Sequence, residues 1–227
     1  MRKLYIGNKN YSSWSMRPWV LMKQAGIPFE EVKLRFDSFA ADSQFKQAIA
    51  KLNPIAKVPV LVDDELVIWD SLAIAEYLAE TFPDKQLWPR AAADRARARS
   101  ICAEMHAGFG NLRTLCGMNI EARLPDVGAK LLQEHPALGG EVERIVQMWG
   151  DLLAAHGGPM LFGEFGIADA YFAPVGTRIK TYGLPVPAAI TAYIERVQAL
   201  PGVKAWIDDA LAENDFLPFE EHYRQQR

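Results

Sequence analysis

The sequence has little of what metal-binding and thiol-exchange proteins depend on. Its 227 residues contain two cysteines, Cys102 and Cys116, and four scattered histidines. The cysteines form no CxxC pair, so the sequence predicts neither a dithiol exchange motif nor a zinc site. We expect two inert, buried thiols in a protein of a reducing compartment.

The sequence also lacks a long apolar run and a strong charge excess. No stretch approaches the roughly 20 apolar residues that a membrane span needs. The first residues, "MRKLYIGNKN", contain no apolar core of a secretory signal. A formal net charge of −3 gives no electrostatic case for nucleic acid or an anionic membrane as a partner. Half of the residues are apolar and 23% are charged, so we expect a globular protein. The few cysteines and scattered histidines lead us to expect a cytoplasmic protein that needs no metal.

The first 82 residues alternate between strand and helix patterns. Apolar periodicity and turn signals predict the order β-α-β-α-β-β-α, over residues 3–6, 13–26, 29–36, 37–49, 58–62, 65–69 and 70–82. Pro18 is expected in the first turn of the first helix, where its missing N–H has no cost. The β-α-β part requires parallel strands, and the hairpin adds an antiparallel edge.

The remainder of the sequence contains only helical patterns. The segment 83–90 carries two prolines, Pro83 and Pro89, and is predicted to be a linker between residues 1–82 and an all-helical domain, residues 91–227. Gly and Pro residues separate the expected helices, which cover residues 93–115, 140–157, 166–183, 187–200 and 201–214.

The corner between the first strand and the first helix, "NYSSWSMRPW" (10–19), contains three serines and no cysteine. A helix N-terminus presents unpaired N–H groups and about half a positive charge, which stabilise an anion. A serine hydroxyl there donates a further hydrogen bond, so the corner suits a thiolate, a phosphate or a carboxylate. The alternative is that a serine only caps the helix.

Two further segments have a similar character. In "NPIAKVPVLV" (53–62), Pro59 stands at the start of an apolar strand, where proline is tolerated. In "WDSLAIAEYL" (69–78), Asp70 and Ser71 stand where a strand meets a helix. Either residue can be an N-cap. Together they also suit an amino-acid head group, with Asp70 on the ammonium and Ser71 with the helix N-terminus on the carboxylate.

The set "SSWSMR", "NPIAKVP" and "WDSLAIAEYL", followed by a helical half, resembles the cytosolic glutathione S-transferases. The N-terminal part resembles a thioredoxin-like domain, and the likeness covers nearly the whole chain. The serine-rich corner is most similar to the serine-type classes, zeta and theta, of which zeta shows two adjacent serines five and four residues before an arginine. Ser12 and Ser13 stand in that relation to Arg17.

The resemblance implies a site for glutathione as co-substrate. Ser12 is the first candidate to donate a hydrogen bond to the thiolate, Ser13 is the second, and Tyr11, at the offset of the tyrosine-type classes, is the third. The glutathione-binding residues that the resemblance implies are Lys57, Val58, Pro59, Asp70 and Ser71. It further implies a cis peptide before Pro59, a homodimer and a role in detoxification.

Some positions depart from the family pattern. Trp14 stands where zeta sequences usually carry cysteine, which weakens the case for a zeta-type isomerase. Gly166 replaces the hydroxyl residue of a helix-capping box, although Asp169 can still accept a backbone N–H. The second-substrate pocket is assigned to His106, Phe109 and Arg113; a surface or packing role for His106 and a solvated Arg113 are the alternatives.

The leading hypothesis is a glutathione transferase that activates the thiol of glutathione for attack on a small electrophile. One alternative is a glutathione-dependent cis–trans isomerase of the maleylacetoacetate isomerase type. Another is a non-catalytic protein that binds glutathione or another ligand. A glutaredoxin-like thiol exchanger is disfavoured because the corner has no cysteine. The sequence does not identify the electrophile.

Overall fold

The computed structural model describes residues 1–227 and begins with the predicted β-α-β unit. Strand β1 (Lys3–Ile6) leads into helix α1 (Ser13–Gln24), which returns to β2 (Glu30–Lys33). The two strands are parallel, with Lys3 opposite Glu30. One expectation was wrong: Pro18 lies inside α1 and not in its first turn, because the helix starts at Ser13. The ring therefore removes one internal hydrogen bond of the helix.

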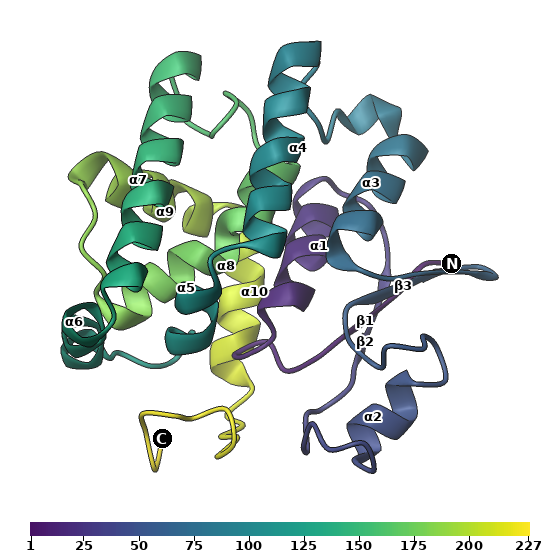
Figure 1. The fold of residues 1–227 in the computed structure, drawn as a ribbon. Helices are drawn as coiled ribbons and strands as arrows, with labels where there is room; N and C mark the ends of the chain where they lie inside the picture. Colours follow the sequence, from purple (N-terminus) through teal and green to yellow (C-terminus); the bar gives the residue numbers. More distant parts are fainter.

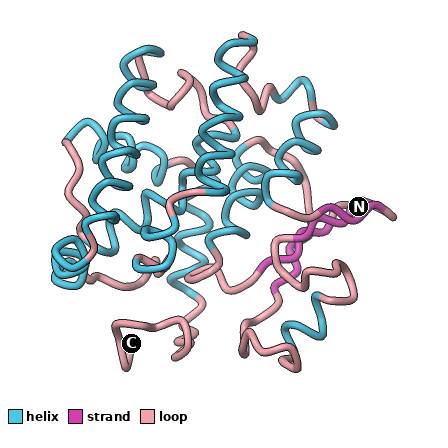
Figure 2. The backbone as a smooth tube through the Cα atoms, in the orientation of Figure 1, coloured by secondary structure: helices cyan, strands magenta, loops and turns pink.

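The antiparallel hairpin completes the N-terminal part. After α2 (Gln44–Ile49) come β3 (Val60–Asp63), β4 (Leu66–Ile68) and α3 (Ser71–Thr81). The strand order is β2-β1-β3-β4, and β3 is antiparallel to both of its neighbours. This is the predicted thioredoxin-like arrangement, and the strands gather at one side of the molecule (Figure 2).

A short 3-10 helix, η1 (Pro83–Lys85), precedes a part of the chain that contains only helices apart from two isolated bridges near Met160. These helices are α4 (Ala92–Ala107), α5 (Gly110–Leu115), α6 (Pro125–Glu134), α7 (Pro136–His156), α8 (Ile167–Tyr182), α9 (Ala188–Ala199) and α10 (Pro201–Ala212). The single helix predicted over 93–115 is in fact two helices. Gly108 is extended and Phe109 is left-handed, with φ 54°, so the chain turns between α4 and α5. Helix α6 was not predicted.

Helix α8 forms the centre of the molecule. In Figure 1, α7 lies at one side and the strands at the other, with α8, α10 and α1 between them. Helix α1 packs against α8 and α10, and one continuous apolar core joins the two parts of the chain. The first turn of α1 is therefore held from behind by α8.

The N-terminus of α8 has the predicted half capping box. Asp169 Oδ2 accepts the N–H of Gly166 at 3.1 Å, and Oδ1 accepts the N–H of Leu161 at 3.1 Å and the hydroxyl of Tyr193 at 2.9 Å. Burial raises the pKa of Asp169 to about 6. The network anchors α8 to α9 and to the loop before it.

Candidate functional site

The loop between β1 and α1 is tied together by its own serines. Ser12 occupies the N-cap position of α1 but makes no capping hydrogen bond. Its hydroxyl donates to Ser15 Oγ at 2.7 Å, and the same Ser15 oxygen accepts the N–H of Gly7 at 3.3 Å. Ser15 is fully buried and holds the loop against the helix. The hydroxyl hydrogen of Ser12 is therefore used within the loop.

Ser13 is held differently. Its Oγ accepts a hydrogen bond of 3.1 Å from Nη2 of Arg178, a buried residue of α8. A serine hydroxyl has one hydrogen to donate and two lone pairs that accept. Because Arg178 uses an acceptor position, the hydrogen of Ser13 is left for a further partner. Nothing in the sequence around Arg178 indicated this contact.

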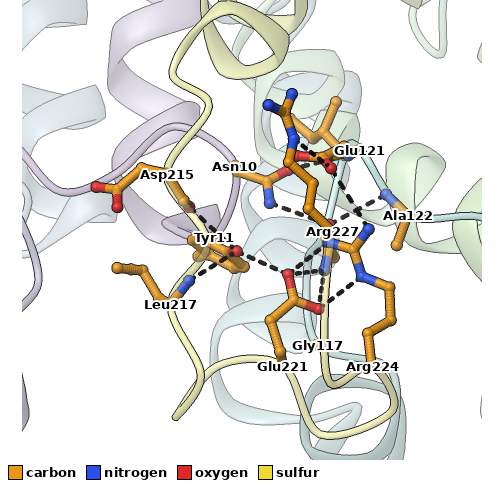
Figure 3. A network of polar contacts seen from close by, with 12 residues as sticks. Asn10, Tyr11, Gly117, Glu121, Ala122, Asp215, Leu217, Glu221, Arg224 and Arg227 are labelled. Atoms are coloured by element: carbon orange, nitrogen blue, oxygen red, sulfur yellow. Dashed lines mark hydrogen bonds and ion pairs between the residues drawn. The ribbon is translucent and has the colours of Figure 1, made fainter.

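Tyr11 points toward the C-terminal segment, residues 213–227. Its hydroxyl donates to Glu221 at 2.7 Å and accepts the N–H of Leu217 at 3.3 Å (Figure 3). Burial and the hydrogen bond with Glu221 raise the pKa of the phenol. Arg224 also binds Glu221, and Asn119 donates to it, so the carboxylate is fully occupied. No local pattern indicated this contact, because Glu221 and Tyr11 are far apart along the chain.

The Asp70-Ser71 pair starts α3 and meets residues of the helical half. Asp70 Oδ1 caps α3 by accepting the N–H of Leu72 at 2.8 Å, and Oδ2 lies 3.3 Å from Nε2 of His106. Ser71 Oγ lies 3.2 Å from the hydroxyl of Tyr171, which shares a 2.7 Å hydrogen bond with Nδ1 of His106. Asp70, His106, Tyr171 and Ser71 thus form one polar chain. The capping role and a binding role for Asp70 are compatible, because they use different oxygens.

The peptide between Val58 and Pro59 is cis, as predicted. It lies beside the Asp70-Ser71 pair in a cavity of about 380 Å³. The residues that line this first cavity are Trp14, Ile55, Lys57, Val58, Pro59, Trp69, Asp70, Ser71, His106 and Arg113. It therefore brings together the five residues proposed for glutathione and two of the three proposed for a second substrate.

A second cavity, of about 360 Å³, lies at the serine corner and shares Trp14, Lys57 and Val58 with the first. Its other lining residues are Tyr11, Ser12, Ser13, Phe36, Phe39, Phe45, Lys46 and Glu220. Phe109, assigned to the second-substrate pocket from the sequence, lines neither cavity and is buried at the turn between α4 and α5. Phe36, Phe39 and Phe45, the aromatic wall of this second cavity, were not predicted as site residues, because they are spread over a loop and the short helix α2.

Two arginines, Arg17 and Arg113, lie against Trp14, and a third, Arg178, contacts Ser13. The guanidinium carbon of Arg17 lies 3.9 Å from the centre of the indole ring, and that of Arg113 lies 5.5 Å from it. Burial lowers the pKa of Arg17 to about 10, with repulsion by Arg113 as a further cause. Burial also lowers the pKa of Arg178 to about 9, with repulsion by Arg17 and Arg113 as further causes. Their hydrogen-bond partners are carbonyl or hydroxyl oxygens and include no carboxylate. Arg17 and Arg178 are thus buried cations without a hydrogen-bonded carboxylate.

The side chains of the protein do not form a reactive thiol site or a metal site. Cys102 and Cys116 are buried and unpaired, and burial raises the pKa of both thiols, that of Cys116 to about 12. No group of three or more His, Cys, Asp or Glu residues is arranged to hold a metal ion. None of the helices combines the length and the apolar character that crossing a membrane requires.

Comparison with known proteins gives matches to both parts of the chain. Residues 11–81 match the glutathione S-transferase N-terminal domain, and residues 120–209 match the glutathione S-transferase C-terminal domain. Glutathione S-transferase 1 of Dianthus caryophyllus is 30% identical over 175 residues, which is 76% of each chain. A probable maleylacetoacetate isomerase of Caenorhabditis elegans is 36% identical over 112 residues, 49% of this chain and half of that protein.

A solved structure adds a three-dimensional likeness. A glutathione transferase homolog from Burkholderia, determined with bound glutathione, superposes with a TM-score of 0.63 at 26% identity and covers 94% of this chain and 99% of its own. The sequence matches and the superposition agree on one fold over nearly the whole length. The chain belongs to the glutathione S-transferase family.

Proposed function

We propose that the protein is a glutathione transferase of the serine type, acting on a small electrophile. The observation that carries the proposal is the convergence of three separate segments on adjoining cavities. These segments are the serine corner, the Val58-Pro59 peptide and the Asp70-Ser71 helix start. A relative with a solved structure binds glutathione, which supports this assignment.

The proposed placement of glutathione follows from charge. The γ-glutamyl ammonium binds Asp70, and its carboxylate binds Ser71 at the N-terminus of α3, where backbone N–H groups favour an anion. The main chain of Val58 binds the cysteinyl backbone, and Lys57 or Lys46 is available to the terminal carboxylate. The sulfur then lies at the serine corner.

Chemistry at the sulfur needs only a lowered pKa and a nearby electrophile. A free thiol titrates near pH 8.5, and the thiolate is the nucleophile. Hydroxyl and N–H donors favour the anion, so the proton leaves to solvent at neutral pH. The thiolate forms a bond to an electrophilic carbon, and the leaving group departs with the electron pair. Holding both reactants side by side supplies proximity.

Calorimetry with glutathione tests the binding site. We expect Asp70→Ala to weaken binding by about 1.5–3 kcal/mol, the usual contribution of a hydrogen bond to a charged group. Asp151→Ala, an exposed carboxylate on α7, is the control and should bind as the unmodified protein does. Equal affinity of Asp70→Ala and the unmodified protein would remove Asp70 from the site.

A second candidate function is cis–trans isomerisation of a conjugated dicarboxylate. Arg113 and His106 line the first cavity, and a relative named as a probable isomerase matches half of the chain. In such a reaction the thiolate adds to the cis double bond, the resulting single bond rotates, and elimination returns glutathione. Trp14, which stands where zeta sequences usually carry cysteine, argues against this reaction. A panel of electrophiles, peroxides and a cis dicarboxylate, each with glutathione, distinguishes transferase from isomerase. Glutathione binding without any turnover would indicate the non-catalytic alternative.

By analogy with the family, the proposal also includes a cytoplasmic homodimer with a role in detoxification. Arg99 pairs with Glu76 of its own chain at 2.8 Å, so it is already neutralised within the subunit. Light scattering on the purified protein measures the mass in solution, and a monomer would contradict this part.

A further inference from the structure

Arg178 is buried in a way that needs a physical reason. Its guanidinium is 4% exposed and belongs to α8, in the helical half of the chain. Nε donates to the carbonyl of Cys116 at 2.8 Å, Nη2 donates to Ser13 Oγ at 3.1 Å, and Nη1 has no partner. Burying a cation without a counter-ion costs several kcal/mol. Buried side chains with such an unpaired atom are uncommon.

Neighbouring charges increase that cost. Arg17 is also buried, both of its Nη atoms lack hydrogen-bond partners, and its Nε donates to the carbonyl of Tyr171 at 3.0 Å. Arg113 donates to the carbonyl of His106. Arg17 and Arg178 are therefore two buried guanidinium groups with no carboxylate among their hydrogen-bond partners, and Arg113 lies nearby on the wall of the first cavity. An anion bound at the serine corner would offset this cost.

Of the three arginines, only Arg178 touches a serine of the corner. We propose that Arg178 is a positioning residue for the thiolate of glutathione, acting through Ser13. By donating to Ser13 Oγ it fixes the orientation of that hydroxyl, so that the hydroxyl hydrogen is left to point at the sulfur. The inference rests on the proposed function and goes beyond it, because it assigns a thiolate-supporting role to a residue of the helical half.

The same geometry favours Ser13 over Ser12 as the donor to sulfur. The hydroxyl of Ser12 already donates to Ser15, whereas no acceptor in the chain uses the hydroxyl hydrogen of Ser13. Hydrogen bonds in a chain polarise one another, so a guanidinium behind the serine oxygen makes its O–H a stronger donor. Arg178 thus lowers the thiol pKa by direct attraction and through the serine.

The test is ultraviolet titration of the glutathione thiolate bound to Arg178→Met, Arg178→Lys and Ser13→Ala. We expect Arg178→Met to raise the apparent pKa of the bound thiol by roughly one unit, since it removes a nearby positive charge and orients Ser13 less well. Arg178→Lys keeps the charge and should recover part of the shift. In a double variant that combines Arg178→Met with Ser13→Ala, the apparent thiol pKa should exceed that of Ser13→Ala only by the direct effect of the lost charge.

Affinity for S-methylglutathione separates positioning from damage to the fold, because this ligand has no thiol proton to lose. We expect the Arg178 variants to bind it within about twofold of the unmodified protein. Thr181→Val is the matched control, because Thr181 is also buried on α8 and donates to the carbonyl of Asn119 at 2.6 Å. It loses a hydrogen bond behind the site and should leave the thiol pKa unchanged.

Two results would overturn the inference. One is an unchanged thiol pKa in Arg178→Met where Ser13→Ala raises it, and the other is an equal rise in Thr181→Val. If Arg178→Met does not fold, the comparison of Arg178→Lys with Thr181→Val decides. Failure of the unmodified protein to bind glutathione would remove the proposed function and this inference together. Normal binding with no pKa effect of Arg178 would remove the inference alone.

Discussion

At the scale of single residues, the site places side chains in two roles at once. Asp70 caps α3 with Oδ1, while Oδ2 faces His106 at the first cavity. Ser13 starts α1 and holds Arg178. Glu220 belongs to the C-terminal segment and lines the second cavity. Burial and the neighbouring Glu221 raise the pKa of Glu220 to about 7. Polar groups at such positions make stability depend on pH.

The carboxyl of Glu220 gives a prediction for that dependence. Its pKa in the folded chain is above the ordinary value of 4.5, so the folded state binds the proton more tightly than the unfolded state. Its contribution to stability is complete below about pH 4.5 and is lost as pH rises to about 7. Urea unfolding at pH 5 and pH 8 should therefore show a fall in stability that is about 1–2 kcal/mol smaller in Glu220→Gln than in the unmodified protein.

Glu65→Gln, at the exposed tip of the β3–β4 hairpin, is the control and should keep the fall. An identical pH dependence in Glu220→Gln and the unmodified protein would show that the carboxyl of Glu220 is solvated in solution.

At the scale of elements, close helix contacts decide where the segments lie. Helix α6 packs on α8 so tightly that a Cβ on Gly128 would lie 1.8 Å from the carbonyl oxygen of Tyr182. In contrast, nothing lies within 4 Å of a Cβ on Gly150, inside α7. A side chain is therefore sterically excluded at Gly128 but not at Gly150, although both glycines lie inside helices.

These two positions form a matched pair for measurement. We expect Gly128→Ala to lower the free energy of unfolding by about 1–3 kcal/mol, because the α6–α8 contact must open. Gly150→Ala should raise it by about 0.5–1 kcal/mol through helix propensity. Urea denaturation of both variants checks the pair, and equal stability of the two would mean that α6 does not press on α8.

At the scale of the whole molecule, the C-terminal segment closes over the N-terminal part. Asp215 binds Arg35 at 2.7 Å, Glu221 binds Tyr11, and the rings of Phe219 and Phe39 lie 5.3 Å apart. Figure 1 shows this segment returning below α10 toward the end of the chain. The segment contributes Glu220 to the lining of the second cavity, so contacts made by the last residues determine part of the wall of that cavity.

Deleting residues 218–227 should open that cavity. We propose that an apolar electrophile contacts the aromatic wall of the second cavity, so its KM should rise about threefold or more when an aromatic contact of Phe39 and one wall are lost. The Kd for glutathione should stay the same, because the Asp70-Ser71 pair is untouched. Steady-state kinetics and calorimetry measure the two quantities. Deleting only 225–227 is the control, and an unchanged KM in the longer deletion would place the electrophile elsewhere.

The sequence alone determined the order of the elements in the first part of the chain. Its resemblance to a family predicted the cis peptide before Pro59 and a common site for Pro59, Asp70 and Ser71. These features are encoded locally, by periodicity, by turn residues and by short motifs shared with a family. Only the tertiary structure broke the helix at Phe109, added α6, and placed Arg178 on Ser13 and Glu221 on Tyr11. Such contacts join residues far apart in the chain, and a lone arginine or glutamate has no local pattern that distinguishes a buried partner from a solvated charge.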